Sequence, residues 1–181
     1  MTTSTTRRMA LIGVTLALLA LDLAAQDPEP IVGTWALNVA RSTFTPGPAP
    51  KSELRTYVLE GQATKVTFKG VNEPRTYTTV RQEIRATSTR VDADGTTMAR
   101  EWTVVFDGRD RPMTGDPDAD MIASKRLDAL TSEFTQRKAG GVVATGTHAV
   151  SKDGNTLTIT TKGINAQGQS ISSVLVFEKQ R

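Results

Sequence analysis

The sequence predicts an all-β fold, namely an antiparallel up-and-down β-barrel of about eight to ten strands that follows an N-terminal signal helix. Three observations lead to this prediction. After residue 25 the chain has no apolar stripe with a helical period, and apolar and polar residues alternate instead. Threonine, which favours strands, is abundant. Pairs of residues that end in glycine recur at the spacing expected of hairpin turns.

Residues 1–25 have the pattern of a signal peptide, which leaves residues 26–181 as one domain. Two arginines at positions 7 and 8 precede an apolar run, Met9–Leu21. This run is shorter than the roughly 20 apolar residues that span a bilayer, and Asp22 follows it, so an uncleaved anchor is the weaker interpretation. We therefore expect a periplasmic or secreted protein, exported by the general route or, given the paired arginines, by the twin-arginine route. Because the chain has no cysteine, it is not expected to be a lipoprotein.

Alternation along residues 26–181 indicates strands with one buried and one solvated face, as in Lys65–Lys69 and Asn155–Thr160. The candidate strands begin near Val32, Ser52, Ala63, Arg75, Thr96, Asp120, Leu130, Val142, Thr156 and Ser170. The turn signals are Glu60–Gly61, Asp94–Gly95, Asp107–Gly108, Gly140–Gly141, Asp153–Gly154 and Gln167–Gly168. Consecutive hairpins favour a meander that closes into a barrel and so removes its exposed edges, with a β-sandwich as the alternative.

Two stretches are predicted to interrupt the meander. Phe44–Pro50 contains three prolines, which remove backbone donors, so we expect an extended crossing or a lid-like loop after the first strand. The segment Asp107–Asp120 contains two prolines and several aspartates and is expected to be irregular.

Gly33-Thr34-Trp35 begins the first predicted strand of the domain. A glycine two residues before a tryptophan allows another backbone to come close while the indole fills the end of a barrel. The motif is weak alone, but it gains weight from its place at the start of an all-β domain.

Four segments, the first of which contains this motif, together form a pattern typical of one protein family. They are Gly33–Pro50, with Trp35, Leu37, Asn38, Ser42 and Phe44; Phe106–Asp120, with Gly108, Arg109, Pro112, Gly115 and Pro117; Ser151–Gln169; and the closing Val176–Gln180. On these segments the chain resembles the small exported bacterial proteins called lipocalin-like, over nearly all of residues 26–181. The resemblance implies a calycin-type barrel and says little about activity.

The sequence departs from the pattern of this family at Arg111, where an aromatic residue is expected. Lipocalins proper also place an arginine of the last strand against the tryptophan. Lys179 and Arg181 are the local candidates for this contact.

Asp116, Asp118 and Asp120 have the odd-position spacing of a calcium loop. However, Met121 stands where the turn needs glycine, and Leu127 where a bidentate glutamate belongs. We therefore favour an Asp-Pro turn whose aspartates bind nearby backbone amides, and we predict no metal site.

His148 shares a strand face with Val142, Ala144 and Val150, so it is expected to point into the barrel, as a hydrogen-bonded strand histidine rather than a general base. Arg126 alternates with Lys125, and the sequence does not show which of the two faces inwards; solvated surface is the favoured reading. Trp102, Val104 and Phe106 form an apolar stripe expected in the core.

Composition excludes several classes of protein. Without cysteine and with one histidine, the chain cannot form thiolate metal centres, disulfide scaffolds or sites with several histidines. The 22 basic and 19 acidic residues give a net charge of +3, too mild to indicate nucleic-acid binding. No cofactor motif or catalytic constellation is present, so an enzyme is the third choice.

The favoured function is binding of a small apolar or amphipathic molecule inside the barrel. Sparse aromatic residues and abundant threonine predict a narrow or partly open cavity. The alternative is a filled barrel that acts as an envelope, stress or protein-interaction module. The sequence leaves the oligomeric state open. The candidate lining residues are Trp35, Tyr57, Tyr77, Trp102, Arg126 and His148.

Overall fold

A computed structural model describes residues 29–69 and 74–181, without the side chains of residues 62–81. The predicted signal peptide, residues 1–25, lies outside the described residues. Within the described part, no helix is long and apolar enough to cross a membrane. The elements are β1 (Gly33–Leu37), the short 3-10 helix η1 (Val39–Arg41), β2 (Ser52–Lys69), β3 (Pro74–Val91), β4 (Thr97–Val104), β5 (Arg111–Thr114), β6 (Met121–Arg126), β7 (Thr131–Lys138), β8 (Gly141–Val150), β9 (Thr156–Ile164) and β10 (Ser170–Lys179).

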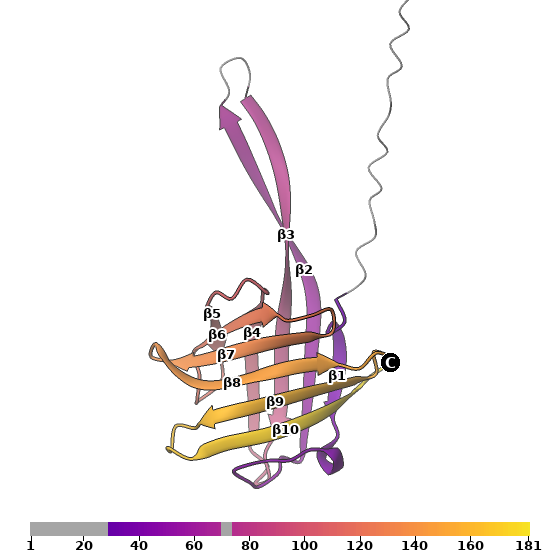
Figure 1. The fold of residues 1–181 in the computed structure, drawn as a ribbon, viewed down its shortest axis with the longest axis vertical. Helices are drawn as coiled ribbons and strands as arrows, with labels where there is room; N and C mark the ends of the chain where they lie inside the picture. Colours follow the sequence, from indigo (N-terminus) through magenta and orange to yellow (C-terminus); the bar gives the residue numbers. More distant parts are fainter. Residues whose placement is uncertain (1–28, 70–73) are drawn as a thin grey trace, which may run out of the picture.

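The ten strands form one closed antiparallel barrel in which each strand pairs with its neighbours along the chain (Figure 1). The barrel closes where β1 lies between β2 and β10, with Trp35 opposite Arg55 on one side and Lys179 on the other. The all-β up-and-down barrel predicted from the sequence is therefore confirmed, and the β-sandwich alternative is excluded.

Five of the six predicted turn signals are confirmed by a glycine with positive φ, which other residues adopt only at a cost. These glycines are Gly95, Gly108, Gly140, Gly154 and Gly168. The turn predicted at Glu60–Gly61 is wrong, because β2 continues through it and Gly61 pairs with Gln82 of β3. A strand tolerates a single glycine when the alternation and the ladder continue on both sides.

The segment Asp107–Asp120 is less irregular than predicted, because it contains the four-residue strand β5. Its proline, Pro112, fits because the pairing with β4 involves only Met113 and Thr114. Phe44–Pro50 forms no strand, as predicted, and Thr45 within this segment accepts a backbone hydrogen bond from Ser172 of β10.

The paired strands β2 and β3 extend well beyond the barrel (Figure 1). The pairing of β1 with β2 ends at Tyr57, and the pairing of β4 with β3 ends at Ile84. Among the described residues, positions 58–83 thus pair only with one another, as a two-stranded ribbon. We call this segment the ribbon.

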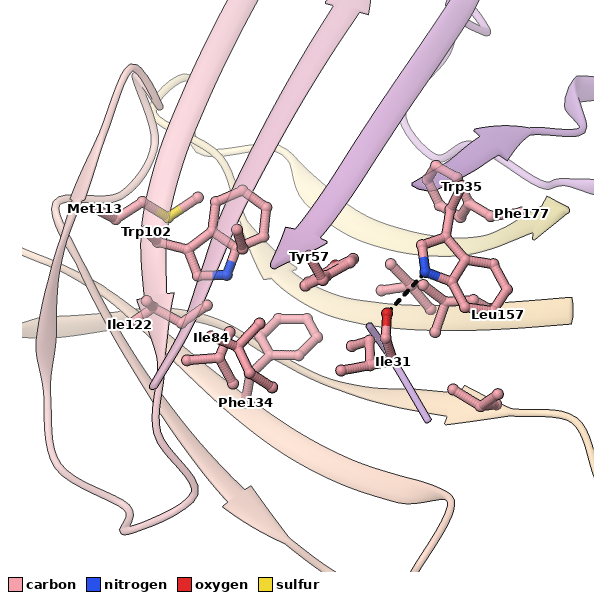
Figure 2. Close-up of a cluster of buried hydrophobic side chains, with 14 of the residues drawn as sticks. Ile31, Trp35, Tyr57, Ile84, Trp102, Met113, Ile122, Phe134, Leu157 and Phe177 are labelled. Atoms are coloured by element: carbon pink, nitrogen blue, oxygen red, sulfur yellow. Dashed lines mark hydrogen bonds between the residues drawn. The ribbon is translucent and has the colours of Figure 1, made fainter. Parts of the chain in front are cut away.

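Large side chains fill the barrel in two groups joined by Tyr57 (Figure 2). Trp35 packs beside Phe177 and Leu157 in one group, and Trp102 lies near Met113 and Ile122 in the other. The sequence prediction that Trp102 and Val104 belong to the core is confirmed, since each is 4% exposed.

The two ends of the barrel differ. At the end from which the ribbon extends, the segment before β1 covers the interior, with Ile31 buried and its carbonyl accepting a 2.8 Å hydrogen bond from the Trp35 indole. At the opposite end, the loop between β5 and β6 approaches the β9–β10 turn, where Ala166 donates a 2.7 Å backbone hydrogen bond to Asp118. We call this second end the mouth.

Strands β8 and β9 approach unusually closely at two glycines. A Cβ at Gly146 would lie 1.9 Å from the Thr160 carbonyl oxygen and 2.5 Å from the Phe134 ring, and one at Gly163 would lie 2.1 Å from the Val143 oxygen. These contacts involve backbone, which cannot move aside without disturbing the ladder.

We predict that Gly146→Ala destabilises the protein by about 1–3 kcal/mol, because the added methyl group overpacks this contact. Urea unfolding followed by tryptophan fluorescence measures the effect. Gly141→Ala is the matched control on the same strand, since a Cβ there meets its nearest atom at 3.6 Å. Equal unfolding midpoints for the two variants would contradict the close approach.

Candidate ligand cavity

A cavity of about 160 Å³ occupies the half of the barrel nearest the mouth. Its lining has two chemically different parts. Strands β6 to β10 contribute mainly apolar side chains, among them Ile122, Phe134, Ile159 and Leu175. Strands β2 to β4 and the loop after β5 contribute the charged residues Glu53, Arg55, Arg90, Arg100, Asp116 and Asp118. The cavity is therefore amphipathic.

Glu53 is the centre of the charged part. Although it is only 3% exposed, its Oε1 atom accepts hydrogen bonds from Arg55 Nε at 2.7 Å, Ser88 Oγ at 2.7 Å and Arg100 Nη2 at 3.0 Å. Arg100 also reaches Asp116 at 3.2 Å. Alternation in the strands places all of these side chains inside the barrel, because Glu53 and Arg55 are two residues apart and Ser88 and Arg100 pair across β3 and β4.

The surroundings of Glu53 fix its charge. Burial alone raises the pKa of this carboxyl, but the charges of Arg55 and Arg100 and the hydrogen bond from Ser88 outweigh burial and lower the pKa from 4.5 to about 2. Burial alone lowers the pKa of Arg55, but the Glu53 carboxylate raises it overall. Both groups therefore stay ionised at neutral pH, inside the protein.

The guanidinium group of Arg55 also lies over aromatic rings. It is 5.0 Å from the ring centre of Phe177 and 5.9 Å from that of Trp102. Such contacts favour a cation whose solvation has been reduced by burial. Arg55 thus contacts both the charged part of the cavity and the aromatic rings of Phe177 and Trp102.

His148 lies inside the barrel, as its strand face predicts, and is 6% exposed. It contacts rings, with centroid distances of 4.9 Å to Phe134 and 6.4 Å to Tyr57. The predicted hydrogen bond is not found among the described residues. Burial, together with the nearby charge of Arg55, lowers the pKa of His148 from 6.5 to about 3, so the imidazole is neutral at neutral pH.

Two buried donors next to the cavity have no hydrogen-bond partner within the described residues. They are the Trp102 indole N–H and the Tyr57 hydroxyl, on rings whose centres are 6.1 Å apart (Figure 2). Burial raises the pKa of Tyr57, so its hydroxyl stays protonated. The Nε atom of Arg100, which lines the cavity, is a third unpartnered donor.

The predicted site residues do not all meet at this cavity. Trp102 and His148 line it, and Tyr57 lies against Trp102. Trp35 lies in the other packing group, with its indole bonded to Ile31. Tyr77 lies in the ribbon, opposite Val66, and its side chain is outside the described residues.

The predicted contact of a last-strand cation with the tryptophan is provided by Lys179. Its Nζ atom lies 5.0 Å from the centre of the Trp35 ring, and its Cε atom passes 2.7 Å from the position that a Cβ would take on Gly33. Gly33, with φ at +137°, therefore makes room for a side chain rather than for the backbone that the motif suggests.

The prediction that Arg126 lies on the solvated surface is wrong. Its neighbours on the same face, Ile122 and Ser124, are buried, so this face points into the barrel. At the covered end, the guanidinium lies 3.8 Å from the centre of the Phe106 ring and forms an ion pair with Glu29. Arg126 thus helps to hold the segment before β1 and is not at the cavity.

The charged residues Glu53, Arg55 and Arg100 were not identified from the sequence. In β2 the exposed residues Leu54 and Val58 are apolar, whereas the inward face carries Glu53 and Arg55. Alternation therefore indicates the wrong face for this strand. Tyr57 could have identified the inward face, because it shares a strand face with both charged residues.

The turn interpretation is confirmed for Asp116, whereas Asp118 and Asp120 bind backbone amides that are distant in sequence, those of Ala166 and Ala139. Asp116 accepts a hydrogen bond from the backbone of Asp118, and Asp120 accepts one from the backbone of Ala139. In the part of the chain that the structure describes, no group of three or more potential ligands could hold a metal ion.

No protein-family model matches the chain, and a search of curated proteins finds no relative. The assignment to the lipocalin-like family therefore stays a prediction.

We predict that acid destabilises the protein through two buried groups. The pKa of His148 is lowered to about 3 by folding, so stability decreases as the pH falls from 6.5 to that value, because only the unfolded chain takes up the proton. The contribution of Glu53, about 3 kcal/mol, is present above pH 4.5 and is lost as the pH falls to about 2.

Urea unfolding between pH 7 and pH 2.5 measures both effects. Glu53→Gln should lower stability at neutral pH by about 3–5 kcal/mol, because Arg55 loses its carboxylate partner and Arg100 keeps only Asp116, and it should flatten the lower part of the pH profile. Glu60→Gln is the control, since Glu60 pairs with Arg85 at the surface. A Glu53→Gln profile parallel to that of the control down to pH 2.5 would contradict the role of Glu53.

Proposed function

We propose that the protein is an exported, non-enzymatic, lipocalin-like binding protein that holds a small amphipathic molecule in the barrel. The observation that carries the proposal is the cavity, with its apolar wall on β6 to β10 and its charged wall on β2 to β4. A fully packed barrel would offer no such volume. Concave sites that are mainly apolar, with a few convergent polar groups, are typical of small-molecule binding.

The perturbed groups around the cavity support the same proposal. Glu53 and His148 both have strongly shifted pKa values, and such groups gather at functional sites. The Ser88 hydroxyl donates a hydrogen bond to Glu53 beside the cavity, but the lowered pKa of Glu53 makes its carboxylate a weak base, so binding explains these groups better than catalysis. Export remains part of the proposal and rests on the pattern of residues 1–25.

We predict that Thr161→Phe, which fills the cavity, lowers the affinity for a small amphipathic probe such as benzyl alcohol by about tenfold or more. Thr161 lines the cavity. Nitrogen–proton NMR provides the readout, because the protein has two tryptophans and only the Trp102 indole lies at the cavity. Its cross-peak should move on titration while that of Trp35, bonded to Ile31, stays in place.

The matched control is Thr158→Phe, a change of the same size on the outer face of β9, which should bind the probe as the wild type does. Extraction of the purified protein with organic solvent, followed by mass spectrometry, tests for a molecule acquired in the cell. Binding that is equal in the two variants, or a Trp102 cross-peak that no probe moves, would contradict a ligand cavity.

The ribbon favours a second function, that of a protein-interaction module. Positions 58–83 pair with no other described strand, and the ribbon extends from the covered end, away from the mouth (Figure 1). A partner bound there would not obstruct the cavity.

We predict that the ribbon can be shortened without loss of the barrel or of probe binding. Residues 62–81 would be replaced by Asn-Gly, which joins the paired residues Gly61 and Gln82 through a tight two-residue turn. The urea midpoint and the benzyl alcohol affinity should stay within error of the wild type. Loss of probe binding in a folded variant would show that the ribbon belongs to the ligand site.

A further inference from the structure

We propose that the cavity, if it binds ligands as inferred above, selects electrically neutral molecules that carry a carbonyl-type oxygen and rejects carboxylates of the same shape. The proposal concerns the charge and the hydrogen-bonding capacity of the ligand, which the binding function leaves open. Its basis is the balance of charges around the cavity and the identity of the unpartnered groups beside it.

Every guanidinium group that lines the cavity already has a carboxylate partner. Arg55 pairs with Glu53 at 2.7 Å, Arg100 with Glu53 and Asp116, and Arg90 with Asp92 at 2.6 Å. A ligand carboxylate would therefore lose its hydration without gaining an uncommitted cation, and it would also meet the charge of Glu53. Burying an uncompensated charge is far more costly than burying a neutral polar group.

His148 offers no positive charge either. Its imidazole lies among Phe134 and Tyr57, and burial favours the neutral form at neutral pH. Among the described residues that line the cavity, every cation thus has a carboxylate partner, and the unpartnered Nε–H of Arg100 belongs to a guanidinium group already paired with Glu53 and Asp116.

The unpartnered polar atoms nearest the interior are hydrogen-bond donors. Trp102 lines the cavity and is 4% exposed, so an oxygen atom that meets its indole N–H must come from inside the barrel. A buried donor without a partner costs about 1–3 kcal/mol, and an acceptor on the ligand would recover part of this free energy.

The volume limits the size of the molecule. An apolar cavity of about 150 Å³ holds benzene, and the present cavity of about 160 Å³ is similar. The buried part of the ligand is therefore about the size of one substituted ring.

Three probes with nearly the same planar shape test the proposal. Acetophenone carries a carbonyl oxygen, benzoate carries a carboxylate, and α-methylstyrene has a methylene group in place of the oxygen. Dissociation constants would be measured at pH 7 from the backbone amide shifts of β8 and β9. We expect acetophenone to bind about tenfold or more tightly than benzoate and several-fold more tightly than α-methylstyrene.

Each outcome has one meaning. Tightest binding of benzoate would overturn the proposal in favour of an anion site, and equal binding of acetophenone and α-methylstyrene would overturn it in favour of a purely apolar site. Either result would leave the binding function intact. If none of the three probes shifts any amide, the binding function itself fails.

The donor is identified by Trp102→Phe, which removes the indole N–H and keeps an aromatic ring. This variant should still bind α-methylstyrene, and its preference for acetophenone over α-methylstyrene should fall well below that of the wild type. Trp35→Phe is the matched control, because the Trp35 indole is committed to Ile31, and it should keep the wild-type preference. An unchanged preference in folded Trp102→Phe would contradict the role of Trp102.

Discussion

The rest of the cavity depends on the carboxylate of Glu53, which holds two arginines inside the barrel. Without it, Arg55 and Arg100 would be buried cations without enough counter-charge, and a chain folds in that way only at a high cost in free energy. Replacing such a group of charges with apolar residues is often neutral or stabilising in other proteins. The network lies along the wall of the cavity, where it would serve the ligand binding proposed above.

The network divides the interior by chemistry. Between the mouth and Tyr57, the wall formed by β2 to β4 is polar and the opposite wall is apolar. Beyond Tyr57, the space is filled by Trp35, Phe177 and Leu157, each less than 2% exposed. For the ligand proposed above, the route to the cavity is therefore the mouth, and the rings of Trp102 and His148 lie at the inner limit of the cavity. The same division explains why Trp35 is a structural residue, covered by Lys179 and bonded to Ile31, although the sequence marks it as a candidate site residue.

The barrel was predictable from the sequence because its evidence is local: alternation, threonine and turn glycines such as Gly154 act within a few residues. The site was less predictable because it depends on partners distant in sequence. Nothing near Glu53 announces that Ser88 and Arg100 will meet it, and the exposed Leu54 and Val58 make β2 look reversed. Tyr57, Trp102 and His148 could be selected because large rings on alternating strands tend to point inwards. At Glu60–Gly61 the sequence predicts a turn that does not form, because eighteen consecutive residue pairs between β2 and β3 continue through this position.

The two ends of the barrel are built from different segments of the chain. The ribbon and the segment held by Arg126 and Glu29 occupy one end, where the interior is covered. The mouth, with Asp118 bonded to the β9–β10 turn, occupies the other, and the chain before β2 runs along β10 there through Thr43 and Thr45. The bond between Ala166 and Asp118 joins two loops, and such a contact opens at a lower cost in free energy than a strand ladder does. Exchange of the proposed ligand at the mouth would therefore leave Glu53 undisturbed. A partner on the ribbon would act on the barrel through β2 and β3, and β2 also carries Glu53 and Arg55.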